Sequence, residues 1–334
     1  MLDVTASNEE SAVDALIAGK VFLITGGAGF IGSALVRALV AAGREVHVID
    51  NLSSGSLRNL HDVASQIVFH QRDLRHYDQI APVVAGAHRI FHLAAIPSVP
   101  KSIDQPVPSH EVDINGTFNL LRAAAEGKAA RVVYAASSSA YGDTPVLPKV
   151  ESMNPQPKSP YALQKLVGEY YASVFSECFH LPTVSLRFFN VFGPRQDPSS
   201  PYSGVLSVFM SCVLEGRSPT IFGDGEQSRD FTYVEDVAGL CLKAAAAPAG
   251  VVSGNVYNAG NGDRFTLNQV WRQLCAIEGV SIEPLYGPAR AGDVKHSQAD
   301  TTIARRDLGH SPQFSFDEGL RRTLEWYRHS LVQT

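Results

Sequence analysis

A glycine-rich turn near the N-terminus constrains the fold of this chain more than any other feature. The apolar run 21–24 ends at Thr25, and Gly26, Gly29 and Gly32 follow it at regular spacing. A short apolar run of this kind predicts a buried parallel strand. We expect the first glycine to permit a tight turn, the second to let the backbone approach a pyrophosphate, and the third to let a helix pack against the sheet.

The residues after this turn complete a dinucleotide-binding unit. A helix is predicted over 30–42, and its first N–H groups and its dipole would face the phosphates. The next predicted strand, 45–50, ends at Asp50, at about the 20-residue distance expected for an acid that binds a ribose. A carboxylate there accepts from a 2′-hydroxyl and repels a 2′-phosphate, so NAD is predicted rather than NADP. A glycine-rich turn can also lack a ligand, but the strand, the helix and Asp50 together favour the dinucleotide.

Composition is typical of a globular α/β enzyme. The chain has 334 residues with 45% hydrophobic and 18% charged residues, and its formal net charge of −5 does not favour a nucleic-acid partner. We predict no membrane segment, and the widely spaced cysteines, without a C-x-x-C pair, indicate reduced thiols rather than a metal site. Residues 1–19 are expected to be an N-terminal extension and not a secretory signal, which predicts a cytoplasmic protein.

Predicted strands and helices alternate over the first part of the chain. The strands are predicted at 20–25, 45–50, 66–70, 89–93, 130–136 and 182–188, and the helices at 30–42, 76–85, 110–127 and 159–178. This alternation predicts an α/β fold with a Rossmann-type doubly wound parallel sheet, forming an NAD-binding domain over 20–190. Beyond it, shorter elements are predicted at 203–215, 219–222, 234–246, 256–259 and 266–278. We interpret 191–334 as a smaller, mixed and predominantly substrate-binding lobe.

A second motif lies at the start of the predicted helix 159–178. Ser159 suits the N-cap and Pro160 the first helical position, which places Tyr161 and Lys165 on one face of the helix. A free tyrosine has a pKa near 10, too high for an efficient base at neutral pH. A nearby ammonium and a positive nicotinamide ring would both lower this pKa, and Lys165 can also hold the cofactor ribose. Because the Tyr-x-x-x-Lys spacing is common, it is also compatible with an ordinary surface helix.

The serine-rich run 137–142 strengthens this interpretation. It follows the predicted strand 130–136, and ligands lie at the carboxyl ends of strands in doubly wound sheets. A hydroxyl at this position can share a hydrogen bond with the substrate oxygen that Tyr161 deprotonates. The alternative is a serine-rich turn that only caps the strand.

With these motifs, the chain resembles the extended short-chain dehydrogenase/reductases, and within them the nucleotide-sugar 4-epimerases of the UDP-N-acetylglucosamine type. The resemblance covers residues 20–328, nearly the whole chain. It rests on the ordered segments 25–32, 50–55, 73–74, 92–95, 115–117, 137–142, 159–165, 187–195, 223–225, 228–231 and 290–293.

The resemblance implies a set of residue roles. Tyr161 would be the catalytic base, Lys165 would tune it and Ser137 would be the hydroxyl partner. The NAD site would comprise Gly26, Gly29, Phe30, Ile31, Gly32, Asp50, Asn51, Ser53, Gly55, Asp73, Leu74, Leu93, Ala94, Ala95, Tyr161, Lys165 and Phe188. The substrate site would comprise Lys101, Ser138, Ser139, Asn190, Val205, Phe222, Arg229, Arg290, Asp293 and Ser297.

Some of these substrate residues would bind the nucleotide rather than the sugar. Asn190 and Arg229 would hold the pyrophosphate of a UDP-sugar, and Arg290 and Asp293 would grip the diphosphate and the nucleoside ribose. The resemblance also implies a homodimer formed through the predicted helices 110–127 and 159–178.

Two departures within the resemblance narrow the reaction. Related 4,6-dehydratases carry Asp and Glu directly after the catalytic hydroxyl residue, whereas this chain has Ser138 and Ser139, which cannot supply that acid–base pair. Ser297 occupies a position where a bulky tyrosine restricts related epimerases to hexoses, and a small residue leaves room for a 2-acetamido group.

The sequence therefore predicts NAD-dependent 4-epimerisation of a UDP-hexose through a 4-keto intermediate, interconverting UDP-N-acetylglucosamine and UDP-N-acetylgalactosamine. The alternative is a UDP-glucuronate 4-epimerase or a related uronate-modifying enzyme, with Lys101 or His296 as partners of the carboxylate. A regulatory NAD-binding protein is a further class, which intact Ser137, Tyr161 and Lys165 disfavour. The sequence does not distinguish a uridine from a thymidine nucleotide in the substrate, and it does not determine the oligomeric state.

Overall fold

A seven-stranded parallel sheet forms the centre of the computed structural model, which describes residues 20–197, 204–289 and 294–332. Its strand order is β11-β6-β5-β4-β1-β2-β3, so the chain starts in the middle of the sheet and winds outward in both directions. The strands are β1 (Val21–Thr25), β2 (Glu45–Asp50), β3 (Ile67–Gln71), β4 (Arg89–His92), β5 (Arg131–Ser137), β6 (Thr183–Phe188) and β11 (Asn255–Ala259).

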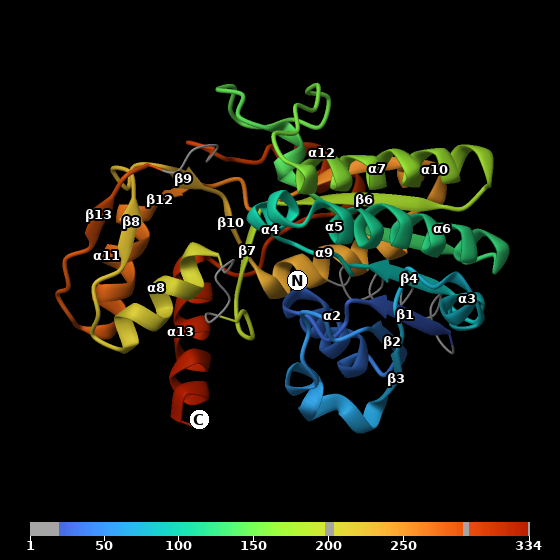
Figure 1. Ribbon diagram of the computed structural model, residues 1–334, viewed down its shortest axis with the longest axis horizontal. Coiled ribbons are helices and arrows are strands. Elements are labelled where there is room, and N and C mark those ends of the chain that lie inside the picture. The colour runs from blue at the N-terminus through green and yellow to red at the C-terminus, as the bar shows by residue number, and fades with distance from the viewer. Residues whose placement is uncertain (1–19, 198–203, 290–293, 333–334) are drawn as a thin grey trace, which may run out of the picture.

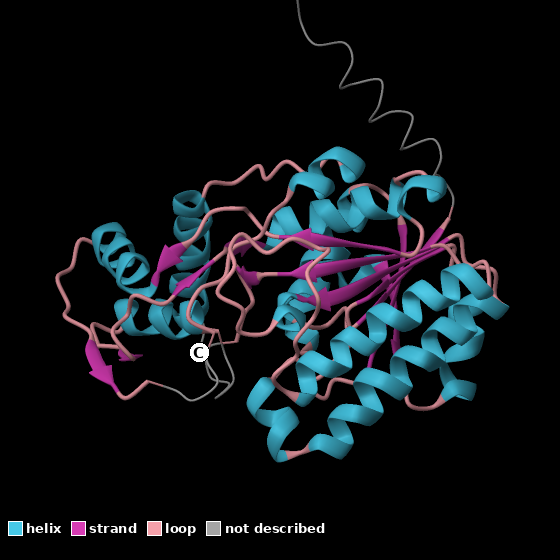
Figure 2. Cartoon of the chain, turned by 90° about the horizontal axis from the view of Figure 1, so that it is seen from above, coloured by secondary structure: helices cyan, strands magenta, loops and turns pink. Residues whose placement is uncertain are grey.

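Helices cover both faces of this sheet, and Figure 2 shows the strands running between them. One face packs against α2 (Phe30–Ala41), the 3₁₀ segment η1 (Leu57–Gln66), α9 (Val234–Ala246) and α12 (Thr302–Leu308). The other packs against α3 (Tyr77–Ala85), α6 (Thr117–Glu126) and α7 (Pro160–Cys178). Because both faces are buried, central strands such as β1 are apolar at nearly every position, as the sequence predicted.

Several short elements connect the larger ones. They are α4 (Val99–Asp104), α5 (Pro106–His110), the π-helical turn η2 (Glu111–Gly116), the 3₁₀ turn η3 (Ser138–Tyr141) and α10 (Ala249–Val252). The predicted helix 110–127 is therefore η2 and α6 joined end to end. None of the helices in the described part of the chain has the length and apolar character needed to cross a membrane.

A smaller lobe lies beside the carboxyl ends of the strands, on the left of Figure 1. It contains α8 (Val205–Leu214), α11 (Leu267–Glu278), α13 (Phe316–Val332) and the short strands β8 (Thr220–Phe222), β9 (Ser228–Arg229), β12 (Phe265–Thr266) and β13 (Leu285–Gly287). Its own core gathers around Phe209, Trp271 and Phe316. The pair β7 (Asn190–Phe192) and β10 (Phe231–Tyr233) leads from the sheet into this lobe.

The predicted doubly wound sheet is confirmed. Two later elements, which were predicted in the smaller lobe, belong to this sheet and its covering helices. The predicted strand 256–259 is β11, which pairs with β6 and extends the large sheet. The predicted helix 234–246 is α9, which packs against α2, β5 and β6. A sequence pattern identifies a buried strand or helix but not the elements that it packs against. The sequence therefore did not predict that the chain returns to the large sheet after the first part of the smaller lobe. The division at residue 190 stays a prediction, and the extension 1–19 lies outside the described residues.

Candidate active site

A cleft of about 500 Å³ opens at the carboxyl ends of the central strands. All of the residues predicted to bind the dinucleotide line it, from Gly26 on the first turn to Phe188 at the end of β6. Ser137 and Asn190 line it as well. The fold therefore brings both sequence motifs, the glycine turn and the tyrosine–lysine helix, to one cavity.

The glycine turn is held tightly against the sheet. Gly26 has a φ of +70°, and its N–H donates to the carbonyl of Ile49 at 2.8 Å. A Cβ on Gly32 would lie 2.2 Å from the carbonyl oxygen of Gly26, so only glycine fits where α2 meets the turn. The N-cap of α2 is Gly29, and no side chain caps the helix. Its first N–H groups are therefore available to an anion, as a pyrophosphate requires.

Asp50 fastens this turn to the end of β2. One carboxylate oxygen accepts from the N–H of Ala28 at 3.0 Å, and the other accepts from the N–H of Leu52 at 2.8 Å. Burial raises the pKa of Asp50, and these two hydrogen bonds oppose the rise. Each oxygen keeps a lone pair, so Asp50 can still accept from a ribose hydroxyl.

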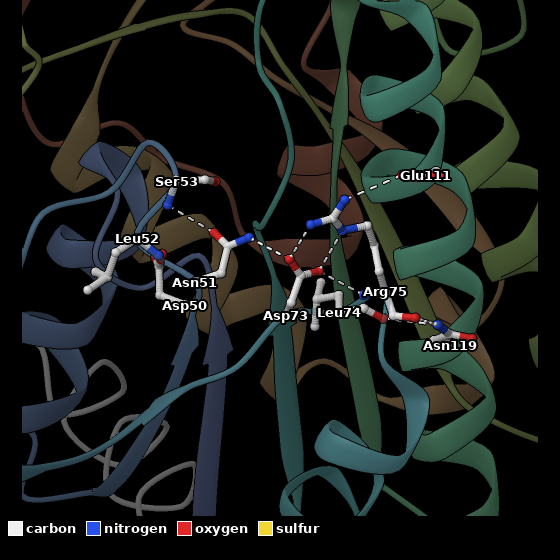
Figure 3. Close-up of polar contacts among 9 residues, drawn as sticks. All are labelled: Asp50, Asn51, Leu52, Ser53, Asp73, Leu74, Arg75, Glu111 and Asn119. Carbon is white, nitrogen blue, oxygen red and sulfur yellow. Dashed lines mark hydrogen bonds and ion pairs between the residues drawn. The ribbon is translucent and has the colours of Figure 1, made fainter.

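A polar network lies next to Asp50, at the end of β3 (Figure 3). The carboxylate of Asp73 accepts from Nε and Nη2 of Arg75, at 3.0 and 2.8 Å, and from the amide of Asn51 at 2.9 Å. These donors hold the pKa of Asp73 well below its usual range, with Arg75 making the largest contribution. Arg75 also reaches Glu111 on η2 at 3.4 Å. Asp73 is thus a fixed anionic acceptor at this end of the cleft.

The other end of the cleft carries the tyrosine–lysine helix. The side chain of Ser159 accepts from the N–H of Ala162 at 3.2 Å, and Pro160 begins α7, which confirms the predicted cap. Lys165 is buried, and its ammonium donates to the carbonyl of Ala135 at 2.9 Å. Ser102 on α4 accepts from the N–H of Tyr161 at 3.1 Å and fixes the first turn.

The hydroxyls of Ser139, Ser137 and Tyr161 form a hydrogen-bonded row at the α7 end of the cleft. The backbone N–H and the hydroxyl of Ser139 both donate to Ser137 Oγ, at 3.2 and 2.8 Å. Ser137 in turn forms a hydrogen bond with Tyr161 that lowers the pKa of the phenol. The predicted pairing of Ser137 with Tyr161 is therefore present, and Ser139 orients Ser137.

The pKa of Tyr161 is nevertheless raised, to about 12, because burial dominates and the charge of Asp113 adds to the rise. The sequence predicts that Lys165 lowers this pKa, whereas the net shift is upward. The geometry explains this, since the ammonium is directed at the carbonyl of Ala135. A positive nicotinamide ring would supply the missing stabilisation of the phenolate.

The predicted substrate residues divide into two groups. Asn190 lines the cleft, where its amide donates to the carbonyl of Asp230 at 3.3 Å. Arg229 and Ser297 are not among the described residues that line the cleft. They lie near each other, because the N–H of Ser297 donates to the carbonyl of Ser228, the residue before Arg229, at 3.0 Å. Val205 begins α8 and Phe222 ends β8, both in the smaller lobe.

The remaining predicted substrate residues are not brought to the cleft lining by the described structure. Lys101 lies on α4, and Ser138 and Ser139 form the turn η3 beside the lining residue Ser137. Arg290 and Asp293 lie outside the described residues.

Sequence reasoning missed several lining residues. These are Ile49, Ser54, Arg72, Pro97, Val112, Ala135, Ala136, Phe189, Val191, Gln196 and Gly204. Most of them neighbour a predicted residue, and that adjacency was an available signal. No predicted site residue neighbours Pro97, Val112, Ala135 or Gln196, so only the fold reveals that they line the cleft.

Comparison with known proteins agrees with this geometry. A model of the "NAD dependent epimerase/dehydratase family" matches residues 22–260. The UDP-glucose 4-epimerase of Mycolicibacterium smegmatis is 37% identical over 316 residues, covering 92% of this chain and 98% of that protein.

Two solved structures are similar in sequence and in fold. The UDP-N-acetylglucosamine 4-epimerase of Methanobrevibacter ruminantium, in complex with UDP-N-acetylmuramic acid, is 38% identical with a TM-score of 0.88, covering 93% of this chain and 99% of that one. The UDP-glucuronic acid 4-epimerase of Bacillus cereus, with UDP-glucuronic acid and NAD, is 31% identical with a TM-score of 0.85, again covering 93% and 99%. The chain belongs to the NAD-dependent epimerase/dehydratase family of extended short-chain dehydrogenase/reductases, and its cofactor is NAD.

Proposed function

We propose that this protein is a UDP-sugar 4-epimerase that interconverts UDP-N-acetylglucosamine and UDP-N-acetylgalactosamine. The observation that carries the proposal is the convergence of Ser137, Tyr161 and Lys165 in the cleft that also contains the glycine turn. The relatives support the coarser part of the proposal, since those with assigned substrates described above are 4-epimerases of UDP-sugars.

The residues suggest how the reaction proceeds. Tyr161 takes the proton of the C4 hydroxyl, while Ser137 shares a hydrogen bond with the same oxygen and Lys165 holds the cofactor ribose. The glycine turn and Asp50 would hold NAD, which when bound would supply the acceptor and the donor of the C4 hydride. Between the two hydride transfers, the 4-keto sugar rotates and presents its opposite face to the cofactor. Its nucleotide stays bound in the smaller lobe. Tyr161 then returns the proton, so the reaction involves no net redox change.

The residues after Ser137 argue against dehydration. Loss of the 6-hydroxyl requires a proton donor and a base beside the sugar. Ser138 and Ser139 stand where the related dehydratases carry these acids, and the hydroxyl of Ser139 is already committed to Ser137. Epimerisation needs neither acid.

The acetamido preference is the finer part of the proposal and rests on Ser297. This small residue follows His296, whose Nδ1 is 2.9 Å from the hydroxyl of Ser228, one residue before the predicted phosphate ligand Arg229. With Arg229 as the phosphate ligand, we propose that Ser297 lies near the substrate diphosphate and that its short side chain leaves room for a 2-acetamido group.

The similarity to the Bacillus cereus enzyme favours the uronate alternative. Its predicted carboxylate partners give less support. Lys101 is not among the cleft-lining residues, and His296 is paired with Ser228. Among the described lining residues at the catalytic end, the only cation is Lys165, which donates to Ala135. A 6-carboxylate would have no other cationic partner among them.

A panel of nucleotide sugars tests the proposal. Purified protein, with no cofactor added, is incubated separately with UDP-N-acetylglucosamine, UDP-glucose, UDP-glucuronate and dTDP-glucose, and the epimers are separated by anion exchange. We expect turnover of UDP-N-acetylglucosamine, with none in the Tyr161→Phe variant. Exclusive turnover of UDP-glucuronate would replace this proposal with the uronate alternative, and exclusive turnover of dTDP-glucose would overturn the choice of nucleotide.

We also propose a homodimer in the cytoplasm. Exposed apolar side chains gather on α6 and α7, where Phe118, Leu163, Tyr170 and Val174 are 39–57% exposed. The three on α7 are seven and four residues apart and so share one face of the helix. A second copy of this face would cover them.

A further inference from the structure

A loop that follows β2 lies on the glycine turn of the cofactor cleft. This loop comprises residues 51–56, of which 53–55 line the cleft. The N–H of Ser56 and the side-chain amide of Asn59 both donate to the carbonyl of Ala28 in the turn, each at 3.0 Å. The loop and the start of η1 therefore form a wall of the cleft, beside the turn that we expect to hold the pyrophosphate.

A second part of the wall comes from the segment after β7. Gln196 and Gly204 line the cleft from this segment. Arg195 directly precedes Gln196 and has a φ of +72°. This left-handed conformation is costly for a residue with a Cβ, and it persists where the surrounding contacts hold it. The backbone is thus constrained at the point where the segment reaches the cleft.

One carboxylate, that of Asp62 on η1, connects the two parts of the wall. Its Oδ2 accepts from Nε of Arg37 at 2.8 Å, and its Oδ1 accepts from Nη2 of the same arginine. The Nη2 atom of Arg195 lies 3.6 Å from Oδ2 of Asp62, within the distance of an ion pair. Two arginines therefore share this carboxylate, one from α2 and one from the segment that carries Gln196.

Arg37 extends these contacts to the helix that begins at the glycine turn. Its Nη1 donates to the carbonyl of Ser33 in the first turn of α2 at 2.7 Å, and its Nη2 also donates to the carbonyl of Asn59. Asn59 is itself hydrogen-bonded to Ala28. A displacement of η1 would therefore disturb the loop that lies on the glycine turn.

The charges of this cluster are partly accessible to solvent. Arg37 makes the largest contribution in holding the pKa of Asp62 below its usual range, and the charge of Arg195 adds to the effect, so Asp62 is ionised at neutral pH. The side chains of Arg37 and Arg195 are 19% and 25% exposed, and that of Asp62 is 53% exposed. Water and salt therefore weaken the ion pairs, and we expect their effect to be modest and to depend on ionic strength.

We propose that Arg37, Asp62 and Arg195 form a cofactor latch that slows the release of NAD, with Asp62 as its positioning residue. The ion pairs fasten the loop on the glycine turn to the segment that carries Gln196. Both parts of the cleft wall are then held in place together while Asp62 and Arg195 are paired. Slow release suits a cofactor that the proposed reaction restores within each catalytic cycle, because exchange would serve no purpose.

The rate of NAD release tests the cofactor latch directly. Protein loaded with radiolabelled NAD is diluted into excess unlabelled NAD, and the label that stays bound is followed with time. Arg195→Gln removes one cation and leaves the pair of Arg37 with Asp62, Asp62→Asn removes the shared charge, and Arg195→Lys keeps the cation. The matched control is Asp317→Asn, which breaks a similarly exposed ion pair with Arg321 on α13, a helix that contributes no residue to the described lining of the cleft.

We expect NAD to dissociate about two- to fivefold faster from Arg195→Gln and from Asp62→Asn than from wild type, the size of effect typical of partly exposed ion pairs. Arg195→Lys should stay near wild type. Added salt should speed release from wild type more than from Asp62→Asn, because the variant has no carboxylate charge left to screen. The double variant should release NAD no faster than the faster single variant, because both changes break the same contact.

A merely structural role would give a different pattern. The NAD-stripped variants would then melt at lower temperature while NAD dissociated at the wild-type rate, and this result would overturn the inference. Multiplied effects in the double variant, or equally fast release from Asp317→Asn, would overturn it as well. Arg195→Gln keeps the test valid if Asp62→Asn folds poorly.

The outcome is also separate from that of the proposed function. Failure to turn over any nucleotide sugar would overturn the proposed function but not the cofactor latch, because the release measurement uses NAD alone.

Discussion

At the scale of single residues, the protein alone does not make Tyr161 a base. Burial raises its pKa to about 12, and the hydrogen bond with Ser137 only partly opposes this. The phenolate therefore needs a positive charge that arrives with the nicotinamide ring. In the proposed reaction, this arrangement would link proton removal by Tyr161 to an occupied cofactor site.

Replacing Tyr161 with Phe tests this role. The ring stays and the ionisable oxygen is lost, so turnover should fall by at least about a hundredfold, the scale of general-base removal. NAD content, measured by absorbance of the dinucleotide released on denaturation, should stay near wild type. Near-normal turnover in the Phe variant would show that another group takes the proton.

Ser297→Tyr tests the preference for an acetamido sugar. A ring placed in a filled pocket costs about 1–3 kcal/mol, which corresponds to a roughly ten- to hundredfold loss with UDP-N-acetylglucosamine. Activity with UDP-glucose should survive, because a 2-hydroxyl does not need that space. The two rates are compared by separating the epimers, and equal losses on both substrates would make Ser297 structural.

At the scale of elements, Asp230 joins three segments that approach the site. Its two oxygens accept from the N–H groups of Asn261, Gly262 and Ala299, at 2.8, 2.9 and 3.0 Å. It is fully buried, and burial raises its pKa to about 6 against the opposing hydrogen bonds. The segment that holds Ser297 is thus anchored next to β9.

Asp230→Asn should destabilise the protein, because the amide nitrogen would face N–H donors, and each unsatisfied buried donor costs about 1–3 kcal/mol. The penalty should depend on pH. The folded state binds the proton of Asp230 more tightly than the unfolded state, so this group's contribution to stability is greatest below its ordinary pKa of 3.8 and declines up to about pH 6.

Chemical denaturation of both proteins across this range measures the difference. The free energy of unfolding of wild type, relative to the Asn variant, should fall as the pH rises through the window. The exposed Asp104→Asn serves as control. A difference that rises with pH would show that Asp230 is ionised more easily in the folded state than we infer.

Arg75 plays a similar organising part at the end of the cleft that contains Asp50 and Asp73. Arg75→Gln removes both side-chain donors that Arg75 gives to Asp73, while Arg75→Lys keeps the charge without the planar fork. Because the pair is partly exposed, we expect about 1 kcal/mol, or a roughly fivefold weaker hold on NAD, in the Gln variant. The Lys variant should be intermediate. NAD binding is measured by calorimetry on stripped protein, with Arg321→Gln on α13 as control, and unchanged affinity in the Gln variant would remove Arg75 from the site.

At the scale of the whole molecule, the exposed apolar face of α6 and α7 predicts a dimer. Tyr170 lies in the middle of this face and is 57% exposed. Tyr170→Glu places a charge where a second copy would bury it, so sedimentation should change from dimer to monomer. Thr302→Glu, at the exposed start of α12, should leave the oligomer unchanged. A wild-type monomer at micromolar concentration would contradict the proposed homodimer.

The parallel sheet and the dinucleotide end of the cleft could be predicted from the sequence. Strand, turn and helix from Val21 to Ala41 are local in sequence, and a Cβ on Gly26 or Gly32 would meet backbone atoms at less than 3 Å. The place of Asp50 could be predicted for the same reason, because Asp50 ends β2, which pairs with β1. Ser159 and Pro160 likewise fixed where α7 begins, and so where Tyr161 and Lys165 point.

Features that depend on partners distant in the sequence could not be predicted in this way. The return of β11 to the large sheet and of α9 to its face depends on pairing that an apolar pattern does not specify. The same holds for Asp113, an ordinary acid in the sequence that becomes a buried neighbour of Lys165 because a π turn directs it there. Long-range packing, rather than local propensity, sets the burial of such groups, and burial is what changes their chemistry.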